Sequence, residues 1–409
     1  MSGSTYEIVI VGGNLGGVAV AHYLLKNTIP ALRKQNNSKS FHVTIVSPSS
    51  HYFWKIAAPR VLVKGEEALY EQILRPIDKG FAKYGDLFAY IQGAAIATDP
   101  AARTIRVKKN DSQEESIHYD SLVIATGTTS ATPLWTLHGD HLETLNALKT
   151  TREELSQAKT VLVAGGGAVG VESSGEIVTT FPNVKVTILS GTDRLLARST
   201  ESLGKAAETS LKKLGVEVIH NVRITGSEKT IDGHPKLKLS DGTERIVDVY
   251  IDGTGGAPNT DWLPAEWLNE GKRVQVDDES LRVTGPDASR VYAVGDAASY
   301  SKQSWLDTDS AVIPVASSIA VDIATTLNQG KAPSQGMLGS LLGYVPGFGS
   351  SLSQKKFSPM KGIFLVPMGP SHGVGMLMGF EIPTFMLSLI KGKSYFLSMS
   401  RTQWNGDAR

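Results

Sequence analysis

The chain contains short apolar runs that end in glycine, a pattern typical of buried parallel strands that turn into a helix. Residues 7–11 form the first run, and the glycine-rich residues 12–17 follow it. Residues 16–26 then have helical spacing, and residues 41–46 form the next apolar run. We expect the longer connection between them, residues 27–40, to be a surface insertion. This order predicts a strand–helix–strand unit with parallel strands.

The same order occurs a second time in the middle of the chain. Residues 160–164 form an apolar run, three consecutive glycines follow it, and residues 168–180 have helical spacing. Residues 184–189 form the strand after that helix, and residues 145–158 predict a helix that leads into the unit. An internal duplication of a supersecondary unit is more informative than either copy alone.

Three further apolar runs end in glycine turns, at residues 121–127, 247–251 and 291–296. A helix is expected to begin near Pro314, because proline suits the first helical position. Strands that alternate with helices favour an α/β fold with parallel sheets. The predicted bounds are residues 1–130 and 272–330 for the first domain, 131–271 for the second and 331–409 for a small C-terminal domain.

The composition of the 409 residues is that of an ordinary soluble enzyme, with 41% hydrophobic and 20% charged residues. The net charge is +1, so no strong positive field draws the protein to nucleic acid. No cysteine is present, which excludes structural disulfides, thiolate metal sites and an internal redox dithiol. The opening residues are short and polar, unlike a signal peptide. We therefore expect a cytoplasmic protein that is not secreted.

The glycine-rich turns have the spacing that dinucleotide-binding folds use. In the second turn, Gly165, Gly167 and Gly170 allow a tight bend, a close approach to a pyrophosphate and close packing of helix on strand. The free N–H groups of the helix N-terminus then face the phosphates. Either turn alone is also compatible with a glycine turn that binds nothing, but two copies favour two bound dinucleotides. The candidate binding residues of the first turn are Gly12, Gly13, Asn14, Leu15, Gly16 and Gly17, with Asn14 in place of the middle glycine.

An acid usually follows such a motif by about 20 residues and binds a ribose hydroxyl. Ser47 and Ser190 occupy the two strand ends where that acid is expected. Position 190 is a serine and not an acid, so no carboxylate there repels a 2′-phosphate, and Arg194 lies nearby. The second site is therefore open to NADPH as well as to NADH. The alternative is that Arg194 only stabilises its own loop.

Taken in order, these motifs resemble those of the pyridine nucleotide-disulphide oxidoreductase superfamily. Within it, the chain is similar to the apoptosis-inducing-factor-like branch, which includes the ferroptosis suppressor oxidoreductase and lies near the type II NADH dehydrogenases. The resemblance implies an α/β fold with two nested Rossmann-like FAD/NAD(P)-binding domains plus a small C-terminal α+β domain. It covers nearly the whole chain and rests on residues 12–17, 126–127, 165–172, 255–260, 292–296 and 391–396.

The resemblance also implies roles for individual positions. The first turn would hold the FAD pyrophosphate, and Thr126 and Gly127 would close over the FAD. Asp296, which follows Gly295, would hydrogen-bond the ribityl chain or a phosphate, and Arg60 matches a position near the flavin. The second turn would hold NADH or NADPH. The further positions that the resemblance includes in cofactor binding are Gly165, Gly167, Gly170 and Gly255.

Two residues are candidates for catalysis. Glu172 matches an acid near the nicotinamide and flavin rings, and Lys391 matches a tail lysine near the same rings. The simpler alternatives are an acid stabilised by the helix dipole and a solvated lysine. His138 and His141 lie in a loop without a carboxylate or cysteine pattern, so no metal site is predicted.

The predicted reaction passes a hydride from NADH or NADPH to FAD and then electrons to an acceptor outside the protein. Without cysteine that acceptor is external, and the resemblance implies a quinone. Two alternatives stay open: an NAD(P)H-sensing flavoprotein with a signalling role similar to apoptosis-inducing factor, and a flavin enzyme of a biosynthetic pathway. Residues 385–390 are apolar and suit either peripheral contact with a membrane or a packed helix. The chain is expected to act as a monomer or a homodimer.

Overall fold

The largest sheet is built around three parallel strands near the N-terminus. The structure is a computed structural model that describes residues 5–35, 39–328 and 353–408. Strand β1 (Tyr6–Val11) lies between β2 (Phe41–Ser47) and β8 (Ser121–Ile124) and is parallel to both. Residues 8–11 are all buried, as expected at the centre of a parallel sheet. The apolar runs predicted there as strands are confirmed.

The chain leaves this sheet after β8, builds a second unit and then returns. Strand β18 (Val291–Ala293) pairs parallel with β8, although the whole second unit separates them in the sequence. At the crossing, β9 (Thr128–Thr129) pairs antiparallel with β17 (Ala257–Pro258). The predicted nesting of one Rossmann-like unit within the other is therefore confirmed.

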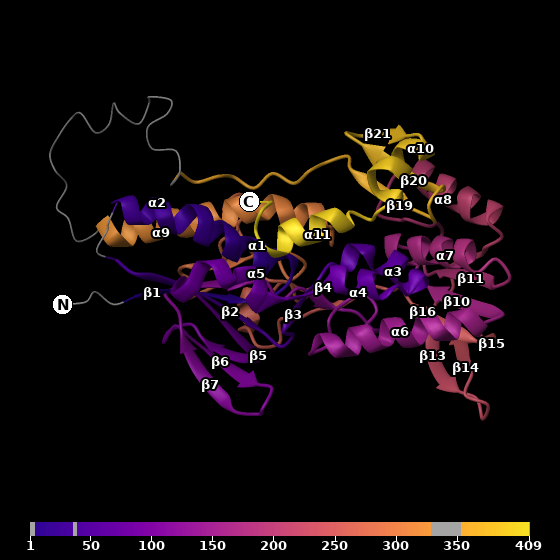
Figure 1. Cartoon of the computed structure of the whole chain (residues 1–409), viewed down its shortest axis with the longest axis horizontal. Coiled ribbons are helices and arrows are strands. Elements are labelled where there is room, and N and C mark those ends of the chain that lie inside the picture. The colour runs from indigo at the N-terminus through magenta and orange to yellow at the C-terminus, as the bar shows by residue number, and fades with distance from the viewer. Residues whose placement is uncertain (1–4, 36–38, 329–352, 409) are drawn as a thin grey trace.

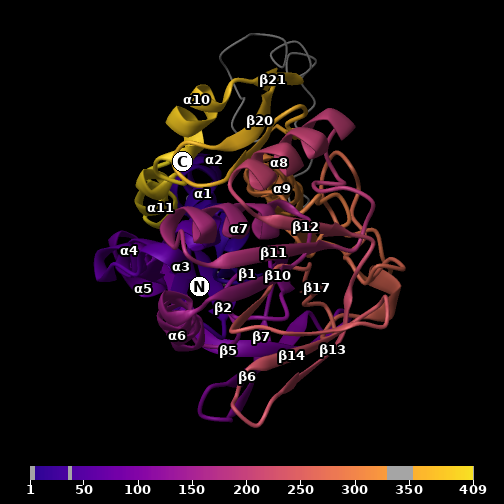
Figure 2. The same ribbon diagram turned by 90° about the vertical axis from the view of Figure 1, so that its right-hand side faces the viewer.

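The second unit contains a four-stranded sheet with the order β12-β11-β10-β16, in which every pair is parallel. Strands β12, β11 and β10 can be followed one after another in Figure 2. Its strands are β10 (Thr160–Ala164), β11 (Lys185–Ser190), β12 (Glu217–His220) and β16 (Val249–Asp252). A small antiparallel sheet follows β12 and consists of β13 (Ile224–Lys229), β14 (Pro235–Leu239) and β15 (Glu244–Ile246).

The edge of the large sheet carries an antiparallel extension that the sequence analysis did not predict. Ile105 and Val107 are buried, whereas Arg106 between them is exposed. This alternation is typical of a strand with one face on the core and one in solvent. The extension consists of β5 (Phe88–Asp99), β6 (Thr104–Lys109) and β7 (Glu114–His118).

Two expectations about helices are wrong. The connection expected as a surface insertion continues α1 (Leu15–Tyr23) through a π-helical turn into α2 (Ile29–Gln35), because Ile29 packs into the core. The helix expected to begin at Pro314 is α9 (Trp305–Asn328), which contains that proline in its interior. A proline within a helix removes one hydrogen bond, and the buried side chains around it in α9 offset that loss.

Helix α9 is also long and apolar enough to cross a membrane by length and composition alone, and it is the one such helix in the described ranges. It packs along α1, and 56% of its most apolar window is buried inside the protein (Figure 1). A mostly buried apolar helix is typical of a protein core.

Six other helices connect the strands or cover the sheets. Helix α7 contacts both α3 and α8, so it lies between the first unit and the edge of the second. These helices are α3 (Ala58–Lys64), α4 (Glu67–Ile73), α5 (Ile77–Phe81), α6 (His141–Gln157), α7 (Ala168–Thr180) and α8 (Glu201–Lys213).

The C-terminal part packs on both preceding units. Its three-stranded sheet lies against α7 and α8, and its last helix, α11 (Leu397–Trp404), returns to α1 and α4 (Figure 1). Residues 331–352 of the predicted third domain lie outside the described residues. The other elements are β19 (Phe364–Pro367), β20 (Gly373–Leu377), β21 (Phe380–Ile382), α10 (Thr384–Leu387) and a π-helical turn (Ser388–Gly392). The predicted fold class is confirmed.

Candidate functional site

The first glycine-rich turn joins β1 to α1. Gly12 has a φ of +122°, and a Cβ added there would lie 2.1 Å from the carbonyl oxygen of Ala125, which follows β8. A Cβ added to Gly17 would lie 1.9 Å from the carbonyl oxygen of Gly12. Glycine at these positions is therefore what lets α1 begin so close to the strand. The first turn of α1, with Leu15 and Gly16 before Gly17, contains no acid and has no side-chain cap.

Asn14 and Ser47 both lie beside this turn. Asn14 has a φ of −121°, so the middle position needs no left-handed backbone, and its Oδ1 accepts a hydrogen bond from Phe53 N at 3.1 Å. Ser47 is buried at the end of β2, and a Cβ added to Gly13 would lie 2.8 Å from Ser47 Cβ. Ser47 thus occupies the place where the ribose-binding acid is expected.

The second turn repeats the geometry of the first. Gly165 has a φ of +113°, and a Cβ on Gly170 would lie 1.9 Å from the carbonyl oxygen of Gly165, the same distance as between Gly17 and Gly12. A Cβ on Gly167 would meet no atom within 4 Å. Space is therefore open in front of α7, whose first turn also contains no acid and has no side-chain cap.

Both turns fit a dinucleotide. Free N–H groups at the N-termini of α1 and α7 suit a pyrophosphate, because no carboxylate competes for them in the first helical turn. Open space of the kind found at Gly167 also lies at Gly127 and Gly255, where an added Cβ would meet nothing within 4 Å. The donor groups therefore suit a pyrophosphate at each turn, and the open space at Gly167 leaves room for a dinucleotide at the second.

Thr126 and Gly127 lie where the chain crosses from one unit to the other. Thr126 Oγ1 donates to the carbonyl oxygen of Asn259 at 2.7 Å, and Asn259 Nδ2 donates to the carbonyl oxygen of Thr126 at 2.9 Å. Gly255 lies on the same crossing, just before β17. These reciprocal bonds fix the two crossing segments beside the glycine-rich turns.

Gly295 and Asp296 follow β18, and the carboxylate of Asp296 is nearly buried. Lys55 Nζ lies 3.0 Å from Asp296 Oδ2, and Ser301 Oγ donates to Oδ1 at 3.1 Å. Burial alone would raise the pKa of Asp296, but Lys55, Ser301 and the Arg273 guanidinium together lower it. Asp296 is thus a fixed anion, and the sequence analysis missed its cation, Lys55.

Ser190 and Arg194 lie at the end of β11 with their side chains bonded within their own loop. Ser190 Oγ donates to the carbonyl oxygen of Arg194 at 3.0 Å. The Arg194 guanidinium donates to the carbonyl oxygens of Ala197 at 2.8 Å and Ser199 at 3.2 Å. This geometry favours the alternative in which Arg194 stabilises its loop.

Glu172 and Lys391, far apart in the sequence, form an ion pair in the interior. Glu172 is on the first turns of α7, is 4% exposed and accepts a hydrogen bond from Lys391 Nζ at 2.5 Å. Lys391 also donates to the carbonyl oxygen of Leu365 at 3.0 Å. Burial raises the pKa of Glu172 to about 7, although Lys391 opposes the shift. Lys391 is therefore not a solvated lysine.

A second buried acid, Glu176, lies one helical turn after Glu172 and binds Arg60. Arg60 Nε and Nη2 donate to the two oxygens of Glu176 at 2.6 and 2.8 Å. The hydroxyl of Tyr395 donates to Glu176 Oε1 at 3.0 Å, and Gly369 N does so at 3.1 Å. The sequence analysis missed this cluster, although the four-residue spacing of the two acids placed them on one helix face.

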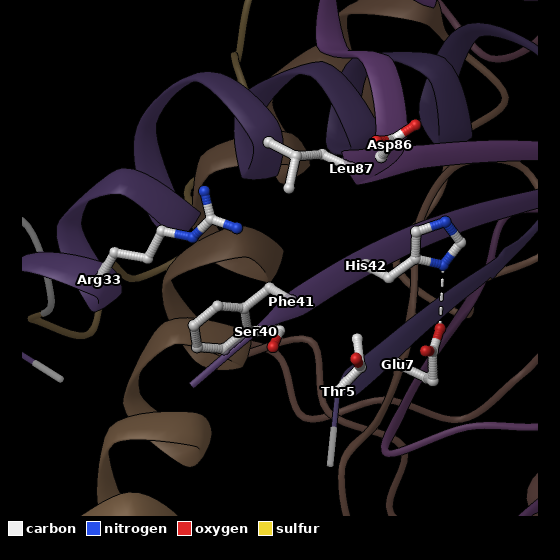
Figure 3. A pocket seen from close by; sticks show the side chains of 8 residues that line it. All are labelled: Thr5, Glu7, Arg33, Ser40, Phe41, His42, Asp86 and Leu87. Carbon is white, nitrogen blue, oxygen red and sulfur yellow. Dashed lines mark hydrogen bonds and ion pairs between the residues drawn. The ribbon is translucent and has the colours of Figure 1, made fainter. Parts of the chain in front are cut away.

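A pocket of about 410 Å³ is drawn in Figure 3. The glycine-rich turns and the Glu172–Lys391 pair contribute no residue to it. Thr5, Glu7, Phe41 and His42 line that pocket at the amino ends of β1 and β2, opposite the first glycine-rich turn. The other lining residues are Arg33, Ser40, Asp86 and Leu87. Its one ion pair in the view joins His42 to Glu7. No cluster of three or more metal-binding side chains occurs in the described part of the chain.

Comparisons with known proteins agree with this geometry. Residues 6–319 match the family described as pyridine nucleotide-disulphide oxidoreductase. The chain belongs to this family. Membership implies FAD and NADH or NADPH as cofactors, whose chemistry is the two-electron transfer between nicotinamide and flavin.

Curated relatives match over nearly the full length. Oxidoreductase phnG of Penicillium herquei is 30% identical over 98% of this chain and 97% of its own. Apoptosis-inducing factor homolog B of Dictyostelium discoideum is 27% identical over 99% and 98%. Human (Homo sapiens) ferroptosis suppressor protein 1 is 25% identical over 96% and 94%. The resemblance to the apoptosis-inducing-factor-like branch is thus confirmed.

Solved structures share the fold. NDH2 from Plasmodium falciparum, solved in complex with NADH, superposes with a TM-score of 0.65 over 98% of this chain and 97% of its own, at 15% identity. At that identity the likeness concerns the fold.

Proposed function

We propose that this oxidoreductase transfers a hydride from NADH or NADPH to FAD and then passes the electrons to an external quinone. In this proposal, residues 1–130 and 272–330 form the FAD-binding domain, residues 131–271 bind the nicotinamide cofactor, and residues 331–409 form the C-terminal domain, whose described part contains Lys391. The observation that carries it is the buried Glu172–Lys391 pair, which joins the second glycine-rich unit to the C-terminal part.

The binding residues have distinct tasks. Gly12 and Gly17 bring α1 close to the strand, so that its N–H groups hold the FAD pyrophosphate, and Gly165 and Gly170 do the same for the nicotinamide cofactor. The Asp296 anion, fixed by Lys55, accepts a hydrogen bond from the ribityl chain. These groups orient the two cofactors, and FAD supplies the electron chemistry when bound.

Glu172 supplies the proton that the acceptor needs. A quinone that takes up two electrons takes up two protons as well, one more than the hydride brings. With a pKa of about 7, Glu172 can hold a proton at neutral pH and release it to an acceptor, and Lys391 stabilises the carboxylate that remains. The Arg60–Glu176 pair holds the neighbouring tail segment, because Arg60 also donates to the carbonyl oxygen of Gly392 at 2.8 Å.

An apolar acceptor has a matching surface beside this pair. Half of the exposed large apolar side chains in the described ranges lie within residues 378–389, here called the tail surface: Met378, Phe380, Phe385, Met386 and Leu389. Helix α10 packs inward through Leu387, which is fully buried, while its neighbours face solvent. The π-helical turn that follows α10 contains Lys391.

The apolar side chains of the tail surface suit peripheral contact with a membrane. Lys393 is exposed shortly after them, whereas Lys391 is bound to Glu172 in the interior. Exposed apolar side chains next to lysines are typical of peripheral membrane binding. Quinones with apolar tails reside in membranes, so this contact would bring the acceptor to the catalytic pair.

The test separates the two half-reactions. FAD-loaded protein is mixed with NADH or NADPH without air, the loss of flavin absorption is followed, and a soluble benzoquinone is then added. We expect rapid bleaching followed by rapid reoxidation. Glu172→Gln should slow the reoxidation by about 100-fold, the usual size of general acid catalysis, while the exposed control Glu154→Gln leaves it unchanged.

Two results would contradict the proposal. If the quinone and every other acceptor reoxidised the flavin only slowly, the long-lived reduced protein would favour the signalling alternative. If Glu172→Gln reoxidised as fast as the parent protein, the acid would be structural.

A further inference from the structure

The end of β11 lacks the acid that discriminates against a 2′-phosphate. Ser190 lies against the second glycine-rich turn, since a Cβ added to Gly166 would lie 2.6 Å from Ser190 Oγ. In this fold the residue at that position faces the adenosine ribose. The Ser190 hydroxyl is bonded within its loop, to the carbonyl oxygen of Arg194 and to Thr192 N. The end of β11 therefore places no negative charge beside the ribose.

The side chain of Arg223 lies across the next residue, Gly191. A Cβ added to Gly191 would lie 2.7 Å from Arg223 Nε and 2.9 Å from Arg223 Cγ. Arg223 Nη2 donates to the carbonyl oxygen of Gly191 at 3.1 Å. The φ of Gly191 is outside the left-handed region, so its backbone would accept any residue. Glycine at position 191 leaves room for Arg223. The Arg223 side chain covers the place where a side chain on residue 191 would lie.

Backbone hydrogen bonds fix Arg223 in this place. Strand β12 runs beside β11 (Figure 2) and is parallel to it. His220 is the register partner of Ser190. After β12, Asn221 N donates to the carbonyl oxygen of Thr192 and Val222 N donates to that of Ser190, both at 3.1 Å. Arg223 N donates to Ser240 Oγ at 3.0 Å. The segment is thus anchored to the loop that it covers.

The guanidinium of Arg223 has donors left for an anion. Arg223 is exposed, and no carboxylate among the described residues forms an ion pair with it. Of its five N–H donors, one is used by Gly191. Arg194 differs, because it donates to two carbonyls of its own loop. Asp193, the acid of that loop, is exposed and forms no ion pair with either arginine in the described part of the chain.

We propose that Arg223 binds the phosphate on the 2′-oxygen of the adenosine ribose, so that the protein selects NADPH over NADH. This inference rests on the proposed binding of the nicotinamide cofactor at the second turn. A guanidinium pairs with phosphate through two parallel N–H groups, which makes it the side chain best suited to this task. Arg194 supports the loop instead of contacting the phosphate.

The test compares two nucleotide fragments on the FAD-loaded protein. Binding of 2′,5′-ADP and of 5′-AMP is measured by calorimetry, and we expect 2′,5′-ADP to bind at least about tenfold more tightly. Arg223→Met should remove that difference and leave 5′-AMP affinity unchanged. Gly191→Ala should do the same by displacing the guanidinium. Arg198→Met, which changes another exposed arginine of the region, should keep the difference.

Each failure has a separate meaning. Equal affinities of the parent protein for the two fragments would overturn the phosphate subsite and leave the hydride-transfer function standing. If Arg223→Met lost affinity for both fragments to a similar degree, Arg223 would only shape the loop. That result would also overturn the subsite. If neither fragment bound and neither NADPH nor NADH bleached the flavin, the dinucleotide site itself would be wrong, and both proposals would fall.

Discussion

A methyl group on Gly170 tests whether the second glycine turn binds the nicotinamide cofactor. In Gly170→Ala, the new Cβ would lie 1.9 Å from the carbonyl oxygen of Gly165, and ordinary contact begins at 3.4 Å. The start of α7 and the turn must therefore separate by about 1.5 Å, the difference between these distances. Both atoms are backbone or attached to it, so no flexible side chain can absorb the change.

The displaced helix start should weaken cofactor binding more than folding. A misplacement of about 1 Å can cost about 100-fold in a positioned site, and overpacking costs about 1–3 kcal/mol of stability. We expect the affinity for NADP⁺ to fall by about 100-fold and the melting temperature to drop by a few degrees. Flavin content should remain, because the first turn is in the other unit.

Two matched variants make the result specific. Gly167→Ala has room for its methyl group and a φ of −80° that alanine accepts, so it should fold normally. Its methyl group would project into the space proposed for the pyrophosphate and should still weaken NADP⁺ binding. Gly17→Ala has the same 1.9 Å clash in the first turn and should release flavin.

The assay is a titration with NADP⁺ followed by the change in flavin absorption, together with the flavin-to-protein ratio and a thermal melt for each variant. The reasoning would be refuted if Gly170→Ala bound NADP⁺ like the parent protein. It would also be refuted if Gly170→Ala lost flavin while Gly17→Ala kept it, since the two turns would then have exchanged roles.

Other predictions concern the buried ion pairs and the tail surface. Arg60→Met should cost about 3–5 kcal/mol of unfolding free energy by leaving Glu176 charged and unpaired, and adding Glu176→Gln should recover part of the loss in denaturant titrations. Glu172 has a raised pKa, so it binds a proton in the folded state that it loses on unfolding, and it favours folding most below pH 4.5. That contribution should be lost between about pH 4.5 and about pH 7, so the melting temperature of Glu172→Gln should rise relative to that of the parent protein over this range. Phe385→Ser should reduce co-flotation with anionic vesicles, and equal flotation would argue against the membrane contact.

Local patterns predicted the parts of the site that depend on neighbouring residues. The glycine turns could be found because each needs a strand before it, a helix after it and fixed spacing, all within a few residues. The equal 1.9 Å approaches at Gly17 and Gly170 show that the duplication seen in the sequence is a duplication of geometry. The serines that replace the ribose-binding acids also lie at the expected strand ends.

Contacts between distant segments could not be predicted in the same way. Glu176 binds Arg60 and Tyr395, which are 116 and 219 residues away, and no periodic pattern joins them. The pairing of Arg223 with Gly191 depends on how the chain turns after β12. The start of α9 was missed because buried packing overrides the local preference of Pro314 for a first helical turn.

The central claim is that the two glycine turns hold FAD and a nicotinamide cofactor so that their rings meet. Anaerobic addition of one NADPH per flavin to the purified protein tests it most directly. We predict a yellow protein whose flavin absorption is lost within the experiment and returns when a quinone is added. A protein that neither retains nor takes up flavin, or whose flavin stays oxidised with both NADPH and NADH, would contradict the account.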